Sequence, residues 1–273
     1  MSRILLASPR RRGFTIAELM VSMAIALLLT VVIAQVFLDT RKNYTVQDDQ
    51  ARVQENSRYA VQTISRIVRQ SAYRSYPGLP STTYFSSTTT PAITGVNGGG
   101  SASDQTPADQ ITLRFQGSGD ASGTADNTVF DCRGNSYGFG IIGMSTFAIR
   151  SGGTDGSGLF CTIVDPATAV AGDWVELVPG VENMQILYGL DTDSPVDRTA
   201  NAYLRINDIS GTSSNLDKIV SARFSLLMRS PSDSSPTLNA TTYSLNGVSV
   251  GPLNDRRVRR VVNFTVNLRN RTP

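Results

Sequence analysis

The chain has 273 residues, of which 40% are hydrophobic and 17% charged, so it can bury a sizeable core as one large domain or two small ones. It contains no histidine and two cysteines, which excludes histidine-based acid–base catalysis, histidine-ligated zinc and a four-thiolate metal site. The net charge of +3 arises in the first thirteen residues, which hold four arginines and no acid, whereas the remainder has 21 basic and 22 acidic residues; no nucleic acid partner is therefore expected.

Positions 19–38, LMVSMAIALLLTVVIAQVFL, form a stretch of twenty residues without a charge. As a helix, this stretch has the length needed to cross a hydrocarbon core of ~30 Å. Four arginines precede it and Arg41 and Lys42 follow it, a balance that predicts a cytoplasmic N-terminus with the rest of the chain across the membrane. Because no small-residue cleavage site of a secretory signal follows the apolar stretch, we expect it to remain in the mature protein.

Two residues do not fit a simple membrane anchor. Gly13 separates the arginines from the apolar run, and Glu18 lies just inside that run. A carboxylate placed deep in a membrane costs about 2.5–3.5 kcal/mol. The alternative is that Glu18 is a tolerated charge at the membrane edge. The string GFTIAELMVSMAI resembles the leader-peptidase site and N-terminal helix of type IV prepilins and pseudopilins. The resemblance implies that prepilin peptidase cuts between Gly13 and Phe14, that Phe14 is N-methylated, and that Glu18 acts in assembly.

Residues 14–76 contain neither glycine nor proline, which predicts one long helix. Residues 14–38 form its transmembrane part. In residues 39–76 apolar side chains recur at helical spacing among charged ones, which predicts an amphipathic part that packs on a globular domain. The helix would be about 90 Å long, and the Pro-Gly pair that follows would end it. Residues 77–110, which are rich in Ser, Thr, Gly and Pro, predict a long, partly mobile loop.

Residues 111–273 predict an antiparallel, β-rich domain, because short runs of apolar and β-branched residues alternate with clusters of Gly, Pro, Asn and Asp. The expected strands are residues 111–115, 144–150, 173–178, 181–189, 218–229 and 261–271. No second helix is expected. The fold class is therefore α+β, with a long N-terminal helix packed on a C-terminal antiparallel domain, as in pilins.

Cys132 and Cys161 fall in the part of the chain expected in the periplasm, an oxidising compartment, so we expect a disulfide rather than two unpaired buried thiols. The segment 138–143 matches G-x-G-x-x-G, but the residues after it are typical of a strand, so we expect a turn rather than a dinucleotide site. A basic cluster precedes the last expected strand, and we expect it to be a solvated or subunit-facing edge. Its members are Arg256, Arg257, Arg259 and Arg260.

The segments VPGVENMQILYGLDTD, KIVSARFSLLMRS and RRVVNFTVNLRNR resemble the C-terminal region of minor pilins of the PilW type, whose domain is similar to the J-type pseudopilin of type II secretion. Relatives often carry an acidic DxDxDG turn after the YG pair. Here Asp191, Asp193 and Asp197 follow that pair, but the third acid of the pattern and its glycine are missing. Since a calcium loop needs six or more oxygen ligands around a sharp glycine turn, we expect a solvated acidic turn rather than a calcium site, and no cofactor.

The resemblance implies a minor pilin, not an enzyme, that helps to prime assembly of a type IV pilus and sits at or near its tip. Its implied partners are the major pilin, other minor pilins and a tip adhesin, with prepilin peptidase as the processing enzyme. The protein would reside in the inner membrane with its C-terminal domain in the periplasm, and then in the pilus on the cell surface. Two alternatives stay open: a J-like pseudopilin of type II secretion, and an adhesive module that binds a surface through residues 77–130.

Overall fold

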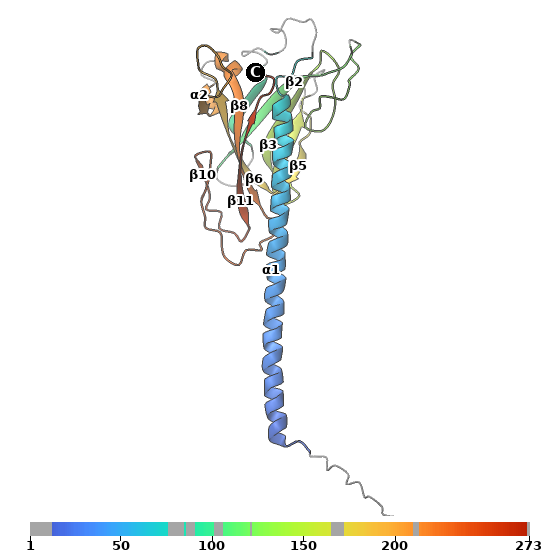
Figure 1. Ribbon diagram of the computed structural model, residues 1–273, viewed down its shortest axis with the longest axis vertical. Coiled ribbons are helices and arrows are strands. Elements are labelled where there is room, and N and C mark those ends of the chain that lie inside the picture. Colours follow the sequence, from blue (N-terminus) through green and yellow to red (C-terminus); the bar gives the residue numbers. More distant parts are fainter. Residues whose placement is uncertain are drawn as a thin grey trace, which may run out of the picture. The chain divides into compact units, whose positions relative to one another are not determined.

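The structure is a computed structural model that describes residues 13–75, 85, 91–100, 106–120, 122–164, 172–209 and 213–271 (Figure 1). The expected leader peptide before Gly13 and much of the expected loop at 77–110 lie outside the described residues. The chain divides into two compact units, Met1–Gln47 and Asp48–Pro273.

Helix α1 (Ile16–Gln70) confirms the prediction of one long helix and contributes residues to both units. It ends at Gln70 rather than at residue 76, because the β domain fixes its end before the Pro-Gly pair is reached. The side-chain nitrogen of Asn270 donates hydrogen bonds to the carbonyls of residues 69–71 at 3.0–3.3 Å. Ala72 then takes a left-handed conformation with φ of 62°, which commonly closes a helix at this position.

Five strands form an antiparallel meander in the order β1-β2-β3-β4-β5. They are β1 (Ile93–Gly100), β2 (Ala108–Gln116), β3 (Ile142–Gly153), β4 (Gly156–Ile163) and β5 (Val175–Pro179). The expected loop at 77–110 is therefore wrong at β1 and at the start of β2, where backbone pairing with the next strand gives order to a sequence rich in glycine. Strand β4 was also not expected, since it begins with Gly and Ser residues that favour turns.

A second antiparallel sheet has four strands in the order β11-β8-β6-β7, so the last strand of the chain forms an edge. The strands are β6 (Val181–Leu190), β7 (Ala202–Leu204), β8 (Ile219–Arg229) and β11 (Arg259–Asn267). The short helices α2 (Ile206–Ile209) and η1 (Ser213–Lys218) lie between β7 and β8, and the hairpin β9 (Tyr243–Leu245)–β10 (Val248–Val250) precedes β11. Leu227, Leu245 and Val250 form a small apolar cluster between this hairpin and β8.

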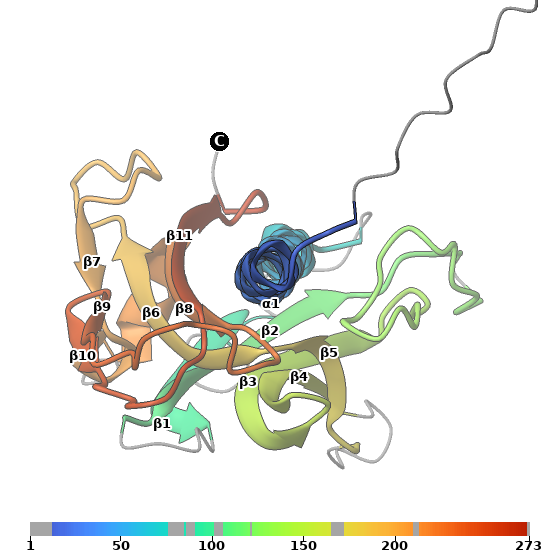
Figure 2. The same ribbon diagram turned by 90° about the horizontal axis from the view of Figure 1, so that it is seen from below.

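The part of α1 that belongs to the second unit lies in the core of that unit, between β11 and β2 in the end-on view of Figure 2. Its side chains Ala60, Ile64, Ile67 and Val68 are fully buried and belong to one apolar cluster with residues of both sheets. Their spacing of three and four residues is the helical period that the sequence predicted. Burying each of the larger side chains stabilises the fold by about 1.5–3 kcal/mol.

Polar contacts join the two sheets at β6. The buried carboxylate of Asp109, on β2, accepts a hydrogen bond of 2.9 Å from the backbone N–H of Ile186, on β6. The side-chain amide of Gln185 donates to the carbonyl of Pro107 at 3.0 Å, just before β2. Burial raises the pKa of the Asp109 carboxyl above its usual value, with the backbone hydrogen bonds from Ile186 and Gly98 acting in the opposite direction.

Candidate assembly site

The start of α1 has the hydrogen-bond pattern of a capping box. The backbone N–H of Thr15 donates to the carboxylate of Glu18 at 3.0 Å, and the N–H of Glu18 donates to the hydroxyl of Thr15 at 3.3 Å. The Thr15 hydroxyl also donates to the same carboxylate at 3.1 Å. Each residue therefore satisfies an N–H that the first turn leaves without a helical partner. The signal T-x-x-E is visible in the sequence, although Thr15 was not singled out there.

Glu18 is thereby held on the first turn of the helix, where the helix dipole favours a negative charge. Phe14 precedes the cap and is 88% exposed. A side chain added at Gly13 would meet no atom of the described residues within 4 Å, so the described fold does not itself require glycine at that position.

The first part of α1 is apolar on all sides. Every residue from 13 to 45 is exposed, including large side chains such as Met20, Leu28 and Phe37. In the described part of the chain, α1 is the one helix long and apolar enough to cross a membrane, by length and composition. A helix with an apolar surface on every side is typical of a membrane span or of the interior of a helical bundle.

Cys132 and Cys161 form a disulfide, as expected. Cys161 lies on β4 and Cys132 in the long connection between β2 and β3, and their Cα atoms are 6.4 Å apart. Both are buried, so the bond attaches this connection to the five-stranded sheet. Such a cross-link stabilises a fold by about 3–4 kcal/mol in the chain-entropy model.

The expected turn at residues 138–143 is also present. A side chain at Gly138 would collide with the backbone of Gly123, and one at Gly143 would collide with the ring of Phe115. Gly140 has φ of 83°, a left-handed conformation that favours glycine. The segment then continues as β3 rather than as a helix, so its glycines serve close packing and not a cofactor phosphate.

The acidic turn after β6 is closed by its own backbone. Asp191 is buried, and its carboxylate accepts hydrogen bonds from the N–H groups of Asp193, at 3.2 Å, and Arg198. Asp197 accepts one from the N–H of Thr199 at 2.8 Å. The expectation of a solvated turn is therefore wrong for Asp191, whose oxygens are used inside the turn. Among the residues that the structure describes, no group of three or more His, Cys, Asp or Glu could hold a metal ion.

The basic cluster at the start of β11 differs from the expectation at Arg259. The Arg259 side chain is only 1% exposed and forms two-point ion pairs with Glu182 and with Asp255. Burial opposes ionisation of Asp255, but the hydrogen bonds from Arg259 and from the N–H of Arg257 outweigh it and hold the pKa of Asp255 below its usual value. Arg256 and Arg260 remain exposed, so only part of the cluster forms a solvated edge.

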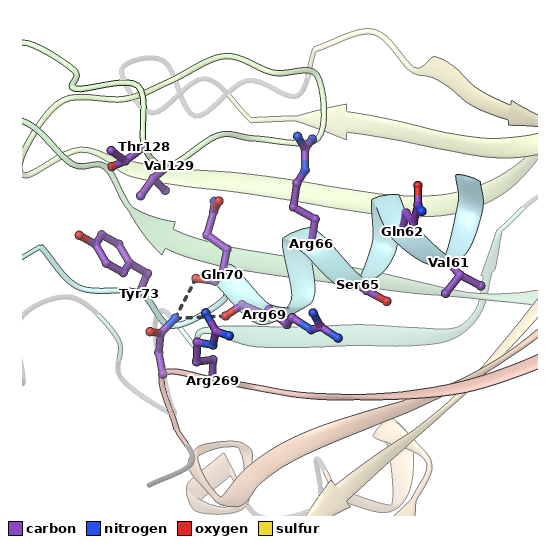
Figure 3. Close-up of a pocket in the computed structure, with 11 residues that line it drawn as sticks. Val61, Gln62, Ser65, Arg66, Arg69, Gln70, Tyr73, Thr128, Val129 and Arg269 are labelled. Atoms are coloured by element: carbon purple, nitrogen blue, oxygen red, sulfur yellow. Dashed lines mark hydrogen bonds between the residues drawn. The ribbon is translucent and has the colours of Figure 1, made fainter. Parts of the chain in front are cut away.

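An open groove of about 760 Å³ lies along the last turns of α1 (Figure 3). Its walls come from α1, from the connection at Thr128 and Val129, and from Arg269 and Asn270 after β11. No sequence pattern pointed to this groove, because it joins residues from three distant parts of the chain.

Two family models match parts of the chain. Residues 146–270 match the family model of type IV pilus-assembly protein W, and residues 8–34 match the model of the prokaryotic N-terminal methylation motif. A solved type IV-like pilin from Thermus thermophilus is 14% identical, with a TM-score of 0.41 over 84% of this chain and 97% of that chain. Among curated proteins, none matches.

The two matched stretches include the apolar start of α1 and the four-stranded sheet. The findings define a type IV pilin, with a methylation motif and an apolar helix that fit a membrane-anchored subunit. Within that class, residues 146–270 are similar to the PilW type, a family of type IV pilus-assembly proteins.

Proposed function

We propose that this protein is a minor pilin that helps to prime assembly of a type IV pilus and sits at or near its tip. Prepilin peptidase would cut after Gly13, and the new N-terminal Phe14 would be N-methylated. Before assembly, α1 would anchor the protein in the inner membrane, with the β domain in the periplasm. The protein would then become part of the filament on the cell surface.

The observation that supports this proposal best is the combination at the start of α1. An acid held on the first helical turn precedes an apolar surface that is exposed on every side, in a chain whose β domain matches a pilus-assembly family. In a bundle of such helices, the carboxylate of Glu18 would be surrounded by apolar side chains and would need an opposite charge. The α-ammonium group of a processed Phe14 in another subunit supplies that charge.

The proposed partners follow from the resemblance to minor pilins: the major pilin, other minor pilins and a tip adhesin would contact the bundle or the β domain. The match to a pilus-assembly family favours a pilus over a type II secretion pseudopilin. No specific feature of the described residues favours the adhesive alternative through residues 77–130.

Deletion of the gene, followed by counting of surface filaments by electron microscopy, tests the priming role. We expect few or no filaments and loss of twitching, with both restored by the wild-type gene. Immunogold labelling of the complemented strain should mark filament ends. Normal filament numbers in the deletion strain would contradict the priming role, and label along the whole filament would contradict tip placement.

A further inference from the structure

We propose that the groove beside the last turns of α1 binds an acidic segment of a neighbouring filament subunit, with its carboxylates paired to Arg66 and Arg69. The identity of the partner as a filament subunit rests on the proposed function. The preference for carboxylates rests on the groove itself. We call this site the arginine groove (Figure 3).

The arginine groove has a strong charge bias. Arg66, Arg69 and Arg269 line it, and no acidic residue of the described part of the chain does. Arg66 and Arg69 are exposed, and neither forms an ion pair with any residue that the structure describes. By contrast, Arg259 has acidic partners inside the fold. A carboxylate bound here would meet guanidinium groups that have planar, two-point geometry for it.

The end of the helix does not account for these arginines. The carbonyls of residues 69–71 already receive hydrogen bonds from Asn270, so no guanidinium is needed to cap them. The C-terminal dipole of a helix corresponds to roughly half a negative charge, which is less than the charge of Arg66 and Arg69 together. A net positive charge therefore remains at this end of the helix and is available to pair with the carboxylates of a partner.

The groove is also held in shape without a ligand. The side-chain amide of Gln70 donates to the carbonyl of Phe130 at 2.7 Å and accepts from its N–H at 3.2 Å, which attaches the helix to the connection that forms the opposite wall.

A second hollow, of about 510 Å³, shares Gln62 with the groove and contains Tyr59, which is 52% exposed. Tyrosine and arginine are among the residues that contribute most to affinity at protein interfaces.

The charges around the groove favour a polypeptide over a nucleic acid. Duplex DNA binding typically requires several phosphate contacts along a row of cations, whereas the chain after its first thirteen residues has no basic excess. The second hollow contains Glu55 as well as Arg58. A phosphate backbone carries a charge at every nucleotide and would be repelled by Glu55 as it ran past Tyr59, whereas a peptide whose carboxylates lie only in the arginine groove avoids this repulsion.

A direct binding measurement tests the chemistry. Full-length processed protein in detergent is titrated against a fluorescent ten-residue peptide of alternating glutamate and glycine, and binding is followed by anisotropy. The test variant is Arg66→Gln/Arg69→Gln, and the matched control is Arg256→Gln/Arg260→Gln, which removes the same charge from exposed positions outside the groove. Two exposed ion pairs predict a loss of about tenfold in affinity for the test variant and little change for the control.

Two results of this binding measurement would overturn the proposal. Equal affinity of the test variant and the control for the peptide would overturn the proposal. So would tighter binding of a twenty-base-pair DNA duplex than of the peptide, if both are lost in Arg66→Gln/Arg69→Gln, because the groove would then recognise phosphate.

A cross-linking experiment in cells tests the identity of the partner. A photo-crosslinking residue at position 62 should give, by mass spectrometry, a cross-linked peptide of another pilus subunit that contains at least two acidic residues, and this product should be lost in Arg66→Gln/Arg69→Gln. Cross-links that persist in this variant, or that form only with non-filament proteins, would overturn the assignment of the partner. Normal filament numbers after gene deletion, together with charge-dependent peptide binding, would instead refute the proposed function and leave the chemistry of the groove intact.

Discussion

Glu18 caps α1 in the structure and, in the proposed function, carries a charge that pairs between subunits; three substitutions distinguish these two roles. Its carboxylate closes the capping box with Thr15, and in a filament the same charge would pair with the ammonium group of another subunit. Glu18→Gln keeps the capping geometry, because glutamine serves at this position of a capping box, but removes the charge. Glu18→Ala removes both, and Thr15→Ala removes the cap while leaving the charge.

The expected sizes of the two effects differ by enough to be separated. Loss of a helix cap costs about 1 kcal/mol, which corresponds to roughly a fivefold change in an equilibrium. Leaving a charge without its partner among apolar helices costs about 3–5 kcal/mol, or more than about a hundredfold. Removing the glutamate strands the partner's ammonium group in this way. Incorporation into pili should therefore fall strongly for Glu18→Gln and Glu18→Ala, and by no more than about fivefold for Thr15→Ala.

The assay is an immunoblot of membrane and sheared-pilus fractions from the same cells, with intact-mass measurement to verify that each variant is processed. All three proteins should accumulate in the membrane, because both Glu18 and Thr15 are exposed and support no tertiary packing. A wild-type ratio of pilus to membrane protein for Glu18→Gln would refute the charge-pairing argument. A loss of only a few-fold would point to the extreme tip, where a subunit has no predecessor to pair with.

Three further predictions concern processing and stability. Gly13→Val should fold but escape cleavage, so its intact mass should include the leader; a chain cut at the wild-type position would contradict the peptidase assignment. Replacing Cys132 and Cys161 with serine should lower the free energy of unfolding in urea by about 3–4 kcal/mol, and free thiols in the wild-type protein would contradict this. Asn270→Ala should lower the free energy of unfolding by about 0.5–1.5 kcal/mol, because the carbonyls at the end of α1 lose their donor, whereas Asn267→Ala, at another exposed position, should cost much less; equal losses would refute the capping role.

Local patterns in the sequence predicted the elements whose signals are local. The helical period of α1 and the alternation in strands such as β8 were sufficient to predict them. Strand β1 was not predictable in this way, since its sequence ITGVNGGG has the composition of a loop. Its order comes from pairing with β2, and Gly95 is required because the hydroxyl of Tyr188 approaches the backbone too closely for any side chain.

The candidate sites also divide into those with a local signal in the sequence and those without one. The N-terminal motif is contiguous, so it could be recognised from Gly13 to Glu18, whereas the partner of Arg259 is Glu182, 77 residues away in sequence. Four neighbouring arginines therefore suggested one solvated edge. The strand instead directs successive side chains to opposite faces, and a buried acid turns one of the arginines into part of the core.

The two ends of α1 are closed by different means, and this difference bears on the proposed assembly. At the C-terminal end the cap is supplied from elsewhere in the chain: Asn270 donates to the last carbonyls, and the N–H of Ala72 donates to the carbonyl of Arg114 at 2.9 Å. Opening that end would disrupt the packing of the β domain. At the N-terminal end the cap is local, between Thr15 and Glu18, and its loss costs only about 1 kcal/mol. In the proposed assembly, the carboxylate would therefore exchange Thr15 for the ammonium group of another subunit at a cost well below the roughly 3–5 kcal/mol at stake in a buried ion pair, while the folded domain would stay unchanged.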